Sequence, residues 1–364
     1  MLRNEIAAAG GWLSFERFMD RALYAPGLGY YAAGARKFGA AGDFITAPEI
    51  SPLFGQCIAS ALAPGLRTYG GDLLELGPGS GRLAFDLLQA LAALGVPPRH
   101  YYLLEVSADL IERQRALLTT LPAELRTRAV WIDRLPRQFE GAIVANEVLD
   151  VVPVHLLHVT QGGVFERGVE WREDAFAWRD MPLPAALQVE AEVIRSYLPA
   201  GFSGDYLTEV SPGVSGLVAS LAEALAHGVL LFIDYGFHRA EYYHHDRIGG
   251  TLMCHYRHFA HTDPFLYPGL QDLTAHVDFT RVAAAAGGLE LVGYTTQAQF
   301  LLNAGITEAI AARQAEGSAA YLTVTNQAQR LLSPAEMGDV FKAIGFSRGG
   351  WPLAALERAR QRPL

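Results

Sequence analysis

The sequence predicts an α/β fold in which helices cover both faces of a mostly parallel sheet. From residue 72 to about residue 145, short apolar runs (DLLEL, YYLLEV, AVWI and GAIVA) alternate with helical segments such as RLAFDLLQALAAL and ADLIERQRALL. Strand–helix alternation with continuously apolar strands is typical of a parallel sheet buried on both sides. A helix near residues 214–227 and the strand VLLFIDY resume the pattern, and we expect LELVGY and FKAIGF to supply the last strands.

The N-terminal part has a different character. An amphipathic helix with Ser14 as its cap is expected over residues 12–24, and another helix over residues 52–63. The Gly- and Pro-rich stretch 26–51 between them is too long for a simple connection, so we expect a functional loop that folds over a ligand as a lid. This divides the chain into an N-terminal helical and lid segment, residues 1–65, and a core, residues 66–364.

Two segments interrupt the core and are expected to be α+β insertions. Residues 153–205 include VHLLHVTQGGVFERGVEWREDAFAW, in which apolar and polar residues alternate around a Gly-Gly turn as in antiparallel hairpins. Residues 236–285 are rich in His, Tyr, Gly and Pro.

Composition restricts the class of protein. Hydrophobic residues make up 51% of the 364 residues, enough for a large core, and the formal charge of −9 argues against a general nucleic-acid binder. Two cysteines, Cys57 and Cys254, cannot form a disulfide framework and suit a reducing compartment. The first residues show no secretory signal, and no apolar run approaches the roughly 20 residues of a membrane span. We expect a cytoplasmic protein, and the oligomeric state stays open, a homodimer being one option.

A glycine-rich loop is the sharpest local motif. The strand DLLEL runs into Gly77-Pro78-Gly79-Ser80-Gly81 and then a helix, an arrangement that lets the backbone approach a ligand closely. The dinucleotide fingerprint requires glycine where this chain has Arg82, so a nicotinamide oxidoreductase is disfavoured. Glu75, two residues before the first glycine, would repel a pyrophosphate but tolerates a cationic sulfonium ligand. The acidic-x-Gly-x-Gly-x-Gly pattern resembles the first motif of class I methyltransferases.

Acidic residues at two further strand ends are candidates for contacts with the nucleoside part of that ligand. Glu105 closes YYLLEV one strand–helix–strand unit after Glu75, where a carboxylate can accept hydrogen bonds from ribose hydroxyls. We include the next residue, Val106, among the cofactor contacts. Asp133 follows AVWI and could bind the adenine amino group, although a loop-capping Asp is equally compatible with this position.

Asn146-Glu147-Val148-Leu149-Asp150 follows the strand GAIVA. Ligands of open α/β sheets lie beyond the carboxyl ends of the strands, so these polar groups are expected near the methyl group to be transferred. The structural alternatives are a turn role for Asn146 and a helix cap for Asp150.

The resemblance extends over most of the chain and identifies a family. The stretches GDFITAPEISPLFG, LLELGPGSGRLAFDLL, LLEVSADL, ANEVLDVVPV, EVSPG, LFIDYG, GTLMCHYRHFAHTDPFLYPGLQDLTAHVDF and TQAQFLLNAGI resemble the MidA-like family, in the family's order. The mitochondrial members of that family are complex I assembly-factor protein-arginine methyltransferases. The resemblance implies a class I Rossmann-like core with a seven-stranded sheet, S-adenosylmethionine as methyl donor, and arginine methylation of a partner protein such as a respiratory-chain subunit.

The chain departs from the family at one informative place. The family often has two aromatic residues after its Asn-Glu pair, whereas this chain has Val148-Leu149, which puts the identity of the substrate in doubt more than the reaction. No mitochondrial targeting segment is visible, so the chain looks like a bacterial relative, and the mitochondrial substrate is not transferred to it.

An arginine substrate requires carboxylates in the site. The guanidinium group stays protonated in water, with a pKa above roughly 12, and carboxylates can hold it through paired N–H bonds. Glu147 is the first choice for this role, with Asn146 beside it. Asp43, Glu49 and Asp278 are candidates for a second carboxylate.

Other conspicuous residues have ordinary structural interpretations. Cys254, His255, His258 and His261 lack a second ligand pair at known zinc spacing, so we expect no metal. A structural hydrogen bond is favoured for His276 over a proton-accepting role. Asp234 either lines the cleft or caps a loop. The aromatic residues Tyr30, Tyr31 and Phe44 could pack on adenine or the lid, with core packing as the default.

Two alternative functions remain open at this stage. The lid and insertions could enclose a small-molecule substrate instead of a protein. The chain could also be an assembly factor that binds S-adenosylmethionine without turnover.

Overall fold

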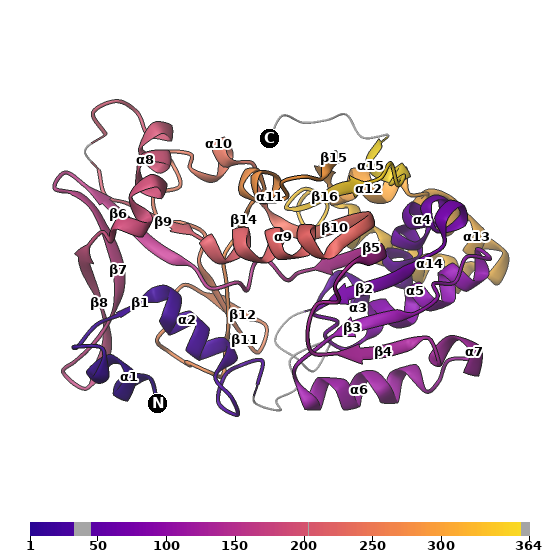
Figure 1. Ribbon diagram of the computed structural model, residues 1–364, viewed down its shortest axis with the longest axis horizontal. Helices are drawn as coiled ribbons and strands as arrows, with labels where there is room; N and C mark the ends of the chain where they lie inside the picture. Colours follow the sequence, from indigo (N-terminus) through magenta and orange to yellow (C-terminus); the bar gives the residue numbers. More distant parts are fainter. Residues whose placement is uncertain (33–44, 203, 358–364) are drawn as a thin grey trace. The chain divides into compact units, whose positions relative to one another are not determined.

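A computed structural model describes residues 1–32, 45–202 and 204–357. Contacts divide the chain into two compact units (Figure 1). The first unit consists of Met1–Lys37, Leu149–Gly216 and Phe237–Arg281, and the second of Phe38–Val148, Leu217–Gly236 and Val282–Leu364. The chain segments therefore group differently from the expected 1–65 and 66–364, since parts of both expected insertions share a unit with the N-terminal helices.

The second unit is built on a sheet with the strand order β15-β16-β10-β5-β2-β3-β4. These strands are β2 (Asp72–Leu76), β3 (Tyr101–Leu104), β4 (Ala129–Ile132), β5 (Phe139–Asn146), β10 (Leu225–Phe237), β15 (Glu290–Thr296) and β16 (Phe341–Arg348). Neighbouring strands from β4 to β10 pair in parallel, and β16 pairs antiparallel with both β10 and β15. The sheet is thus mostly parallel, as the sequence predicts.

Both faces of this sheet are covered. Every residue from Val229 to Ile233 in β10 has 0% exposure, although successive side chains of a strand point to opposite faces. The helices of this unit are α3 (Ala47–Ile50), α4 (Pro52–Tyr69), α5 (Arg82–Ala93), α6 (Ala108–Leu118), α7 (Ala123–Arg126), α12 (Gln297–Asn303), α13 (Ile306–Ala312), α14 (Ser318–Leu332) and α15 (Ala354–Glu357). An apolar core joins α4, α5 and α12 to α15 with one face of the sheet.

The strand order reverses beside β2. From β2 the chain passes through α5 to β3 on one side and β4 beyond it, whereas the next strand, β5, lies on the other side of β2. Ligands of open α/β sheets bind beyond the carboxyl ends of the strands at such a switch point. The loops after β2 and β5 therefore define where the site should lie.

The first unit is made of antiparallel sheets. Its larger sheet has the order β1-β7-β6-β9, with β8 paired to β7, and its smaller sheet has the order β12-β11-β13. The strands of these sheets are β1 (Leu13–Ser14), β6 (His155–Thr160), β7 (Gly163–Arg172), β8 (Ala175–Pro182), β9 (Tyr206–Val210), β11 (Met253–Tyr256), β12 (Phe259–His261) and β13 (Asp272–Thr274). The short strand β14 (Val277–Asp278) belongs to neither of these two sheets. The helices are α1 (Leu2–Ala8), α2 (Phe15–Tyr24), α8 (Gln188–Tyr197) and α10 (Arg239–Tyr242). Two helices, α9 (Pro212–Ala224) and α11 (Phe279–Ala285), continue from the first unit into the second along the chain.

Most element predictions are confirmed. Ser14 caps α2 by accepting a hydrogen bond from the Arg17 N–H at 3.3 Å. The predicted helix over residues 52–63 continues to Tyr69, and the Gly-Gly turn joins an antiparallel pair, β6 and β7. Several short strands are not predicted from the sequence, and β9 is one of them: it pairs with β6, so the antiparallel sheet extends beyond residue 205.

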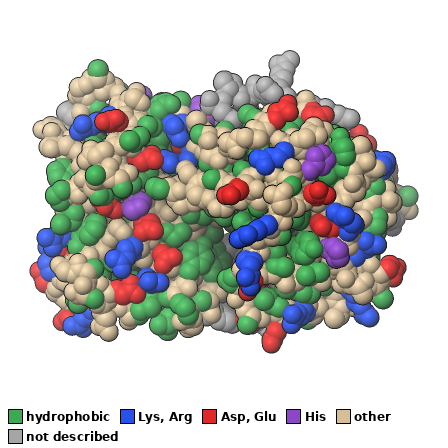
Figure 2. All heavy atoms as spheres, viewed as in Figure 1, with side chains coloured by type: hydrophobic (Ala, Val, Ile, Leu, Met, Phe, Trp, Pro, Cys, Tyr) green, Lys and Arg blue, Asp and Glu red, His purple; other side chains and the backbone are tan. Residues whose placement is uncertain are grey.

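Within the described ranges, no helix combines the length and apolar character that crossing a membrane requires. Acidic and basic side chains are interspersed on the face shown in Figure 2, without a large cluster of one sign.

Candidate active site

The glycine loop after β2 has the backbone that its sequence requires. Gly77, Gly79 and Gly81 have φ angles of 57°, 51° and 82°, the left-handed region where glycine is strongly favoured. Space is also limited, because a Cβ on Gly77 would lie 3.1 Å from Val148 and one on Gly81 would lie 3.0 Å from Gln114. The loop leads directly into α5, so its backbone is shaped for close approach to a ligand.

Glu75 lies buried below this loop. Its side chain is 3% exposed, and the Tyr101 hydroxyl donates a hydrogen bond to it at 2.6 Å. Burial raises the pKa of Glu75 to about 7; the hydrogen bond from Tyr101 acts in the opposite direction and the charge of Glu105 adds to the increase. Glu75 is therefore poised between its neutral and ionised forms near neutral pH, and a nearby cation would favour the ionised form.

Glu105 is held in place at the end of β3. One carboxylate oxygen accepts hydrogen bonds from the N–H groups of Val106 and Ser107 at 2.9 and 2.8 Å, and the other accepts one from the Gln114 amide at 3.3 Å. The Val106 side chain is 82% exposed, so its contribution here comes through its backbone.

Asp133 is fixed less firmly than Glu105. It follows β4, its side chain is 76% exposed, and it forms an ion pair with the adjacent Arg134 at 3.2 Å. Because the four strands β4, β3, β2 and β5 are parallel neighbours, Asp133 lies at the same edge of the sheet as the glycine loop. A role toward adenine stays a prediction.

The Asn146-Glu147 turn after β5 has a strained backbone. Glu147 adopts a φ of +53°, which costs a side-chain-bearing residue about 1 kcal/mol or more and is concentrated at functional sites. Its N–H donates to the Ile233 carbonyl at 2.9 Å. Its carboxylate accepts hydrogen bonds from the Asn146 amide at 3.1 Å and the Ala47 N–H at 3.4 Å.

Asn146 leaves an acceptor available in this turn. Its amide nitrogen bonds Glu147, whereas its Oδ1 atom is buried and has no hydrogen-bond partner among the described residues. Buried polar atoms in native proteins are almost always paired. An orphaned oxygen beside a carboxylate therefore indicates a place for a donor that a ligand supplies.

Helix α3 connects the two loops. Ala47 at its start contacts Glu147, and Glu49 within it forms a hydrogen bond with the Ser80 hydroxyl of the glycine loop. Glu49 thus joins the predicted site. Asp43 and Phe44 lie outside the described residues.

Asp234 acts on the same turn. It is 1% exposed on β10 and accepts hydrogen bonds from the Val148 N–H at 3.1 Å and the Tyr235 N–H at 2.9 Å. It therefore fixes the backbone that follows Glu147.

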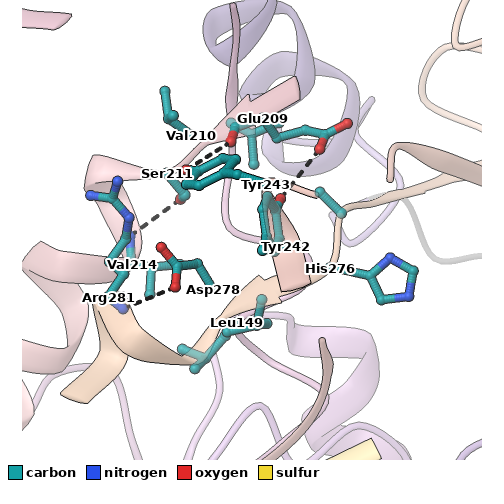
Figure 3. Close-up of a pocket in the computed structure, with 13 residues that line it drawn as sticks. Leu149, Glu209, Val210, Ser211, Val214, Tyr242, Tyr243, His276, Asp278 and Arg281 are labelled. Carbon is teal, nitrogen blue, oxygen red and sulfur yellow. Dashed lines mark hydrogen bonds between the residues drawn. The ribbon is translucent and has the colours of Figure 1, made fainter. Parts of the chain in front are cut away.

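Asp278 and His276 belong to the first unit, where they line a pocket (Figure 3). Asp278 is 8% exposed, forms an ion pair with Arg239 at 2.8 Å and accepts a hydrogen bond from the Arg281 N–H at 3.2 Å. These contacts give Asp278 a structural role at the start of α11. Whether it also acts in catalysis stays a prediction.

Glu209 lines the same pocket (Figure 3). It is 1% exposed and accepts hydrogen bonds from the N–H groups of Thr251 and Leu252 at 2.8 and 2.9 Å. The hydroxyls of Thr251 and Tyr242 donate to its second oxygen at 2.9 and 3.2 Å. Four donors thus surround this carboxylate.

The conspicuous tyrosines pack within the first unit. Tyr30 is 2% exposed and meets Tyr31 edge-to-face, with the ring centroids 5.0 Å apart. The Tyr31 hydroxyl donates to the Asp272 carboxylate at 3.0 Å. Core packing therefore accounts for both rings.

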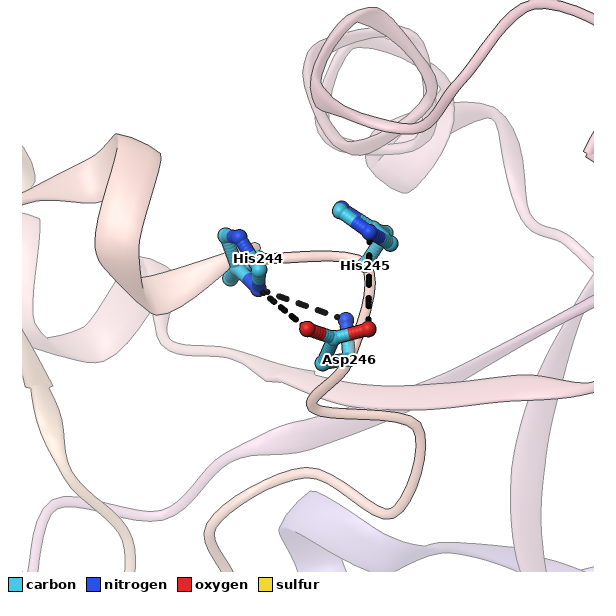
Figure 4. A group of neighbouring side chains, drawn as sticks. All are labelled: His244, His245 and Asp246. Atoms are coloured by element: carbon cyan, nitrogen blue, oxygen red, sulfur yellow. Dashed lines mark hydrogen bonds and ion pairs between the residues drawn. The ribbon is translucent and has the colours of Figure 1, made fainter.

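Among the described residues, one group of possible metal ligands brings three ligand atoms within 4.8 Å of one another: His244, His245 and Asp246 (Figure 4). These residues are consecutive and exposed, and the imidazoles pair with Asp246 at 3.6 and 3.4 Å. Structural zinc sites have four ligands, usually from more than one segment, so the cluster resembles a solvated ion pair and the expectation of no metal stays a prediction.

Sequence comparison decides the family. The family described as S-adenosyl-L-methionine-dependent methyltransferases matches residues 56–295. The chain belongs to this family. The methyltransferase is 30% identical to the zebrafish (Danio rerio) protein arginine methyltransferase NDUFAF7, over 94% of this chain and 84% of that protein. It is 29% identical to the Drosophila melanogaster homologue, over 96% and 84% of the two chains. The MidA-like resemblance is thereby confirmed.

Solved structures agree with this assignment. A Burkholderia thailandensis protein whose crystal structure holds S-adenosyl-homocysteine shares 47% sequence identity and superimposes with a TM-score of 0.91, covering 97% of this chain and 92% of that one. A native structure of a Burkholderia thailandensis protein shares 46% identity with a TM-score of 0.89, covering 98% and 93% of the two chains. The methyltransferase therefore has the fold that the sequence predicts.

The residues present suit S-adenosylmethionine, the cofactor of this family. The left-handed glycines give a tight turn in which a Cβ on Gly77 or Gly81 would crowd Val148 or Gln114, and Glu105 is held at the end of β3, where a ribose contact is predicted. Glu75 supplies a buried carboxylate whose ionised form a cationic ligand would favour.

Proposed function

We propose that this methyltransferase transfers a methyl group to an arginine side chain of a partner protein. The orphaned Asn146 Oδ1 atom beside the Glu147 carboxylate carries this proposal. A guanidinium group has only N–H donors, so two adjacent acceptors at the carboxyl end of β5 are what it requires. The names of the relatives as protein arginine methyltransferases support the same acceptor.

Glu147 would hold and orient the guanidinium. Its position is fixed by the left-handed turn and by the hydrogen bonds of Ile233 and Ala47. A carboxylate that accepts two N–H bonds draws the positive charge toward the bound nitrogens and leaves electron density on the third. When bound, S-adenosylmethionine supplies an electrophilic methyl group. A neighbouring carboxylate accepts the proton that the methylated nitrogen releases, and Glu49 is the candidate for that step.

We infer the partner and the location of the reaction from the resemblance to the MidA-like family. The MidA-like family points to a subunit of the respiratory chain, and we place the reaction in the cytoplasm. The substitution of Val148-Leu149 for the aromatic pair of the family favours an arginine-bearing segment that differs from the mitochondrial one.

A methyl-transfer assay with radiolabelled S-adenosylmethionine tests the proposal. The purified enzyme is incubated with a lysate from cells that lack it, and labelled proteins are mapped by mass spectrometry. Glu147→Gln should lower labelling by about 10²- to 10³-fold, because the amide cannot carry the charge that orients the guanidinium. Binding of S-adenosylhomocysteine should stay within about twofold, since Glu147 contacts the acceptor.

Glu140→Gln is the matched control, because Glu140 is exposed on the same strand. Normal turnover by Glu147→Gln contradicts the assigned role. Label confined to small molecules identifies a small-molecule methyltransferase. Donor binding without transfer to any fraction of the lysate identifies an assembly factor that only binds the donor.

A further inference from the structure

Gln114 occupies a core position on a helix that is otherwise ordinary. Leu110, Gln114 and Leu118 recur every four residues along α6 and are 4%, 0% and 2% exposed, so they lie on one face of the helix. An apolar residue would be expected at the centre of such a stripe. A fully buried amide is costly unless its donors and acceptor are all paired.

The Gln114 amide is paired to three separate elements. Its nitrogen donates to the Gly79 carbonyl in the glycine loop at 2.9 Å and to the Glu105 carboxylate after β3 at 3.3 Å. Its oxygen accepts the Trp131 indole N–H of β4 at 2.8 Å. The bonds use both amide N–H groups and the carbonyl oxygen.

Gln114 also forms a wall of the glycine loop. A Cβ on Gly81 would lie 3.0 Å from its Cγ atom, so the loop packs directly on this side chain. One residue thus contacts the loop at Gly79 and Gly81 and holds the strand-end carboxylate of Glu105.

From this arrangement, we infer that Gln114 is a positioning residue for the cofactor, which fixes the glycine loop and the Glu105 carboxylate relative to each other. The glycine loop and the Glu105 carboxylate belong to different loops, and Gln114 then holds them at a fixed distance from each other before the cofactor binds. Such preorganisation reduces the ordering cost of binding. The inference concerns the cofactor of the family and does not depend on arginine as the acceptor.

The chemistry of the three contacts selects glutamine. Methionine fills a similar volume but leaves the Gly79 carbonyl, the Glu105 carboxylate and the Trp131 indole without this partner. Glutamate can accept from Trp131, but its ionised carboxylate would repel the Gly79 carbonyl and Glu105. Glu105 is the acidic group that the amide bonds, and its charge in turn acts on Glu75. Arg115 lies over the Trp131 ring with its guanidinium carbon 5.0 Å from the centroid.

Titration calorimetry with S-adenosylhomocysteine tests the inference in a double-mutant cycle. Gln114→Met should weaken binding about tenfold in the native background. In the Glu105→Gln background the same substitution should weaken binding by less than about threefold, because the carboxylate that Gln114 orients is absent. Gln89→Glu, exposed on α5, is the control and should bind as the native protein does.

A second variant covers the case in which Gln114→Met does not fold, as judged by melting without ligand. Burial beside Glu105 should raise the pKa of the carboxyl introduced by Gln114→Glu, and its neutral form keeps one donor. Gln114→Glu should therefore bind closest to native affinity at about pH 5 and progressively worse than the native protein toward about pH 8. Native-like binding by Gln114→Met, an equal loss in both backgrounds, or a constant ratio of Gln114→Glu to native affinity across that pH range overturns the inference.

Discussion

Two buried glutamates, one in each unit, differ in how fully their carboxylates are hydrogen-bonded. Glu209 in the first unit and Glu75 in the second are 1% and 3% exposed, and burial raises the pKa of both. Four donors surround Glu209, whereas among the described residues Glu75 accepts its side-chain hydrogen bond from Tyr101. Glu209 links the segments around β9 through its hydrogen bonds. Glu75 directly precedes the glycine loop, and its carboxylate can accept further hydrogen bonds.

The comparison shows that burial alone does not identify a functional carboxylate. A carboxylate whose lone pairs are filled by its own protein is part of the structure. A carboxylate of equal burial with few internal donors is kept at a cost that a cationic ligand can offset. The two residues should therefore respond in opposite ways to substitution.

The largest effect is expected from Glu209→Leu. This change leaves the Thr251 and Leu252 N–H groups and the Tyr242 hydroxyl without their acceptor, and unpaired buried groups cost roughly 1–3 kcal/mol each. We expect the free energy of unfolding to fall by about 4 kcal/mol in urea denaturation. Glu192→Leu, exposed on α8 of the same unit, should change it by less than about 0.5 kcal/mol. An unchanged free energy of unfolding in Glu209→Leu would contradict the structural role of Glu209.

The free energy of unfolding should depend on pH in a way that reports the raised pKa of Glu75. The folded pKa of Glu75 is about 7, whereas an unfolded glutamate titrates near about 4.3. Between these values the unfolded state binds fewer protons, so this group makes the ligand-free protein less stable as pH rises, by on the order of 3 kcal/mol in total. Glu75→Gln should abolish that loss, and the two proteins should converge below about pH 4. Parallel stability curves from pH 5 to pH 8 contradict the raised pKa.

The smallest effect is on affinity for the methyl donor. Glu75→Gln should weaken S-adenosylmethionine binding about tenfold at pH 8, because the ionised carboxylate that favours a cation is lost. At about pH 6 the difference should shrink, since Glu75 of the native protein is then mostly neutral. Calorimetry at both pH values measures this, and a loss of equal size at both would show that charge is not the cause.

The sequence predicts the second unit well because its signals are local. Strand runs such as residues 129–132, helix α6 and the glycine loop are each encoded within a few consecutive residues. Because these strands are expected to be parallel, their carboxyl ends are expected at one edge of the sheet. The sequence alone therefore predicts that Glu75, Glu105 and Glu147 lie at the edge of the sheet where a ligand is expected.

The features that the sequence does not predict depend on contacts between segments that are distant along the chain. Gln114 follows Arg113 in a charged helical segment, and only the fold shows that its amide meets Gly79 and Trp131. The pairing of β9 with β6 joins strands separated by about one expected insertion. Asp278 looks like a free carboxylate in the sequence until Arg239 is placed beside it.

The left-handed backbone at Glu147 has a consequence for laboratory evolution of this enzyme. Glycine or asparagine would relax that turn and stabilise the protein by a few tenths to about 1 kcal/mol. Libraries screened only for heat tolerance should therefore accumulate these replacements at position 147 and return robust but inactive enzymes. Screens that retain an activity filter should preserve the glutamate and draw their gains from elsewhere.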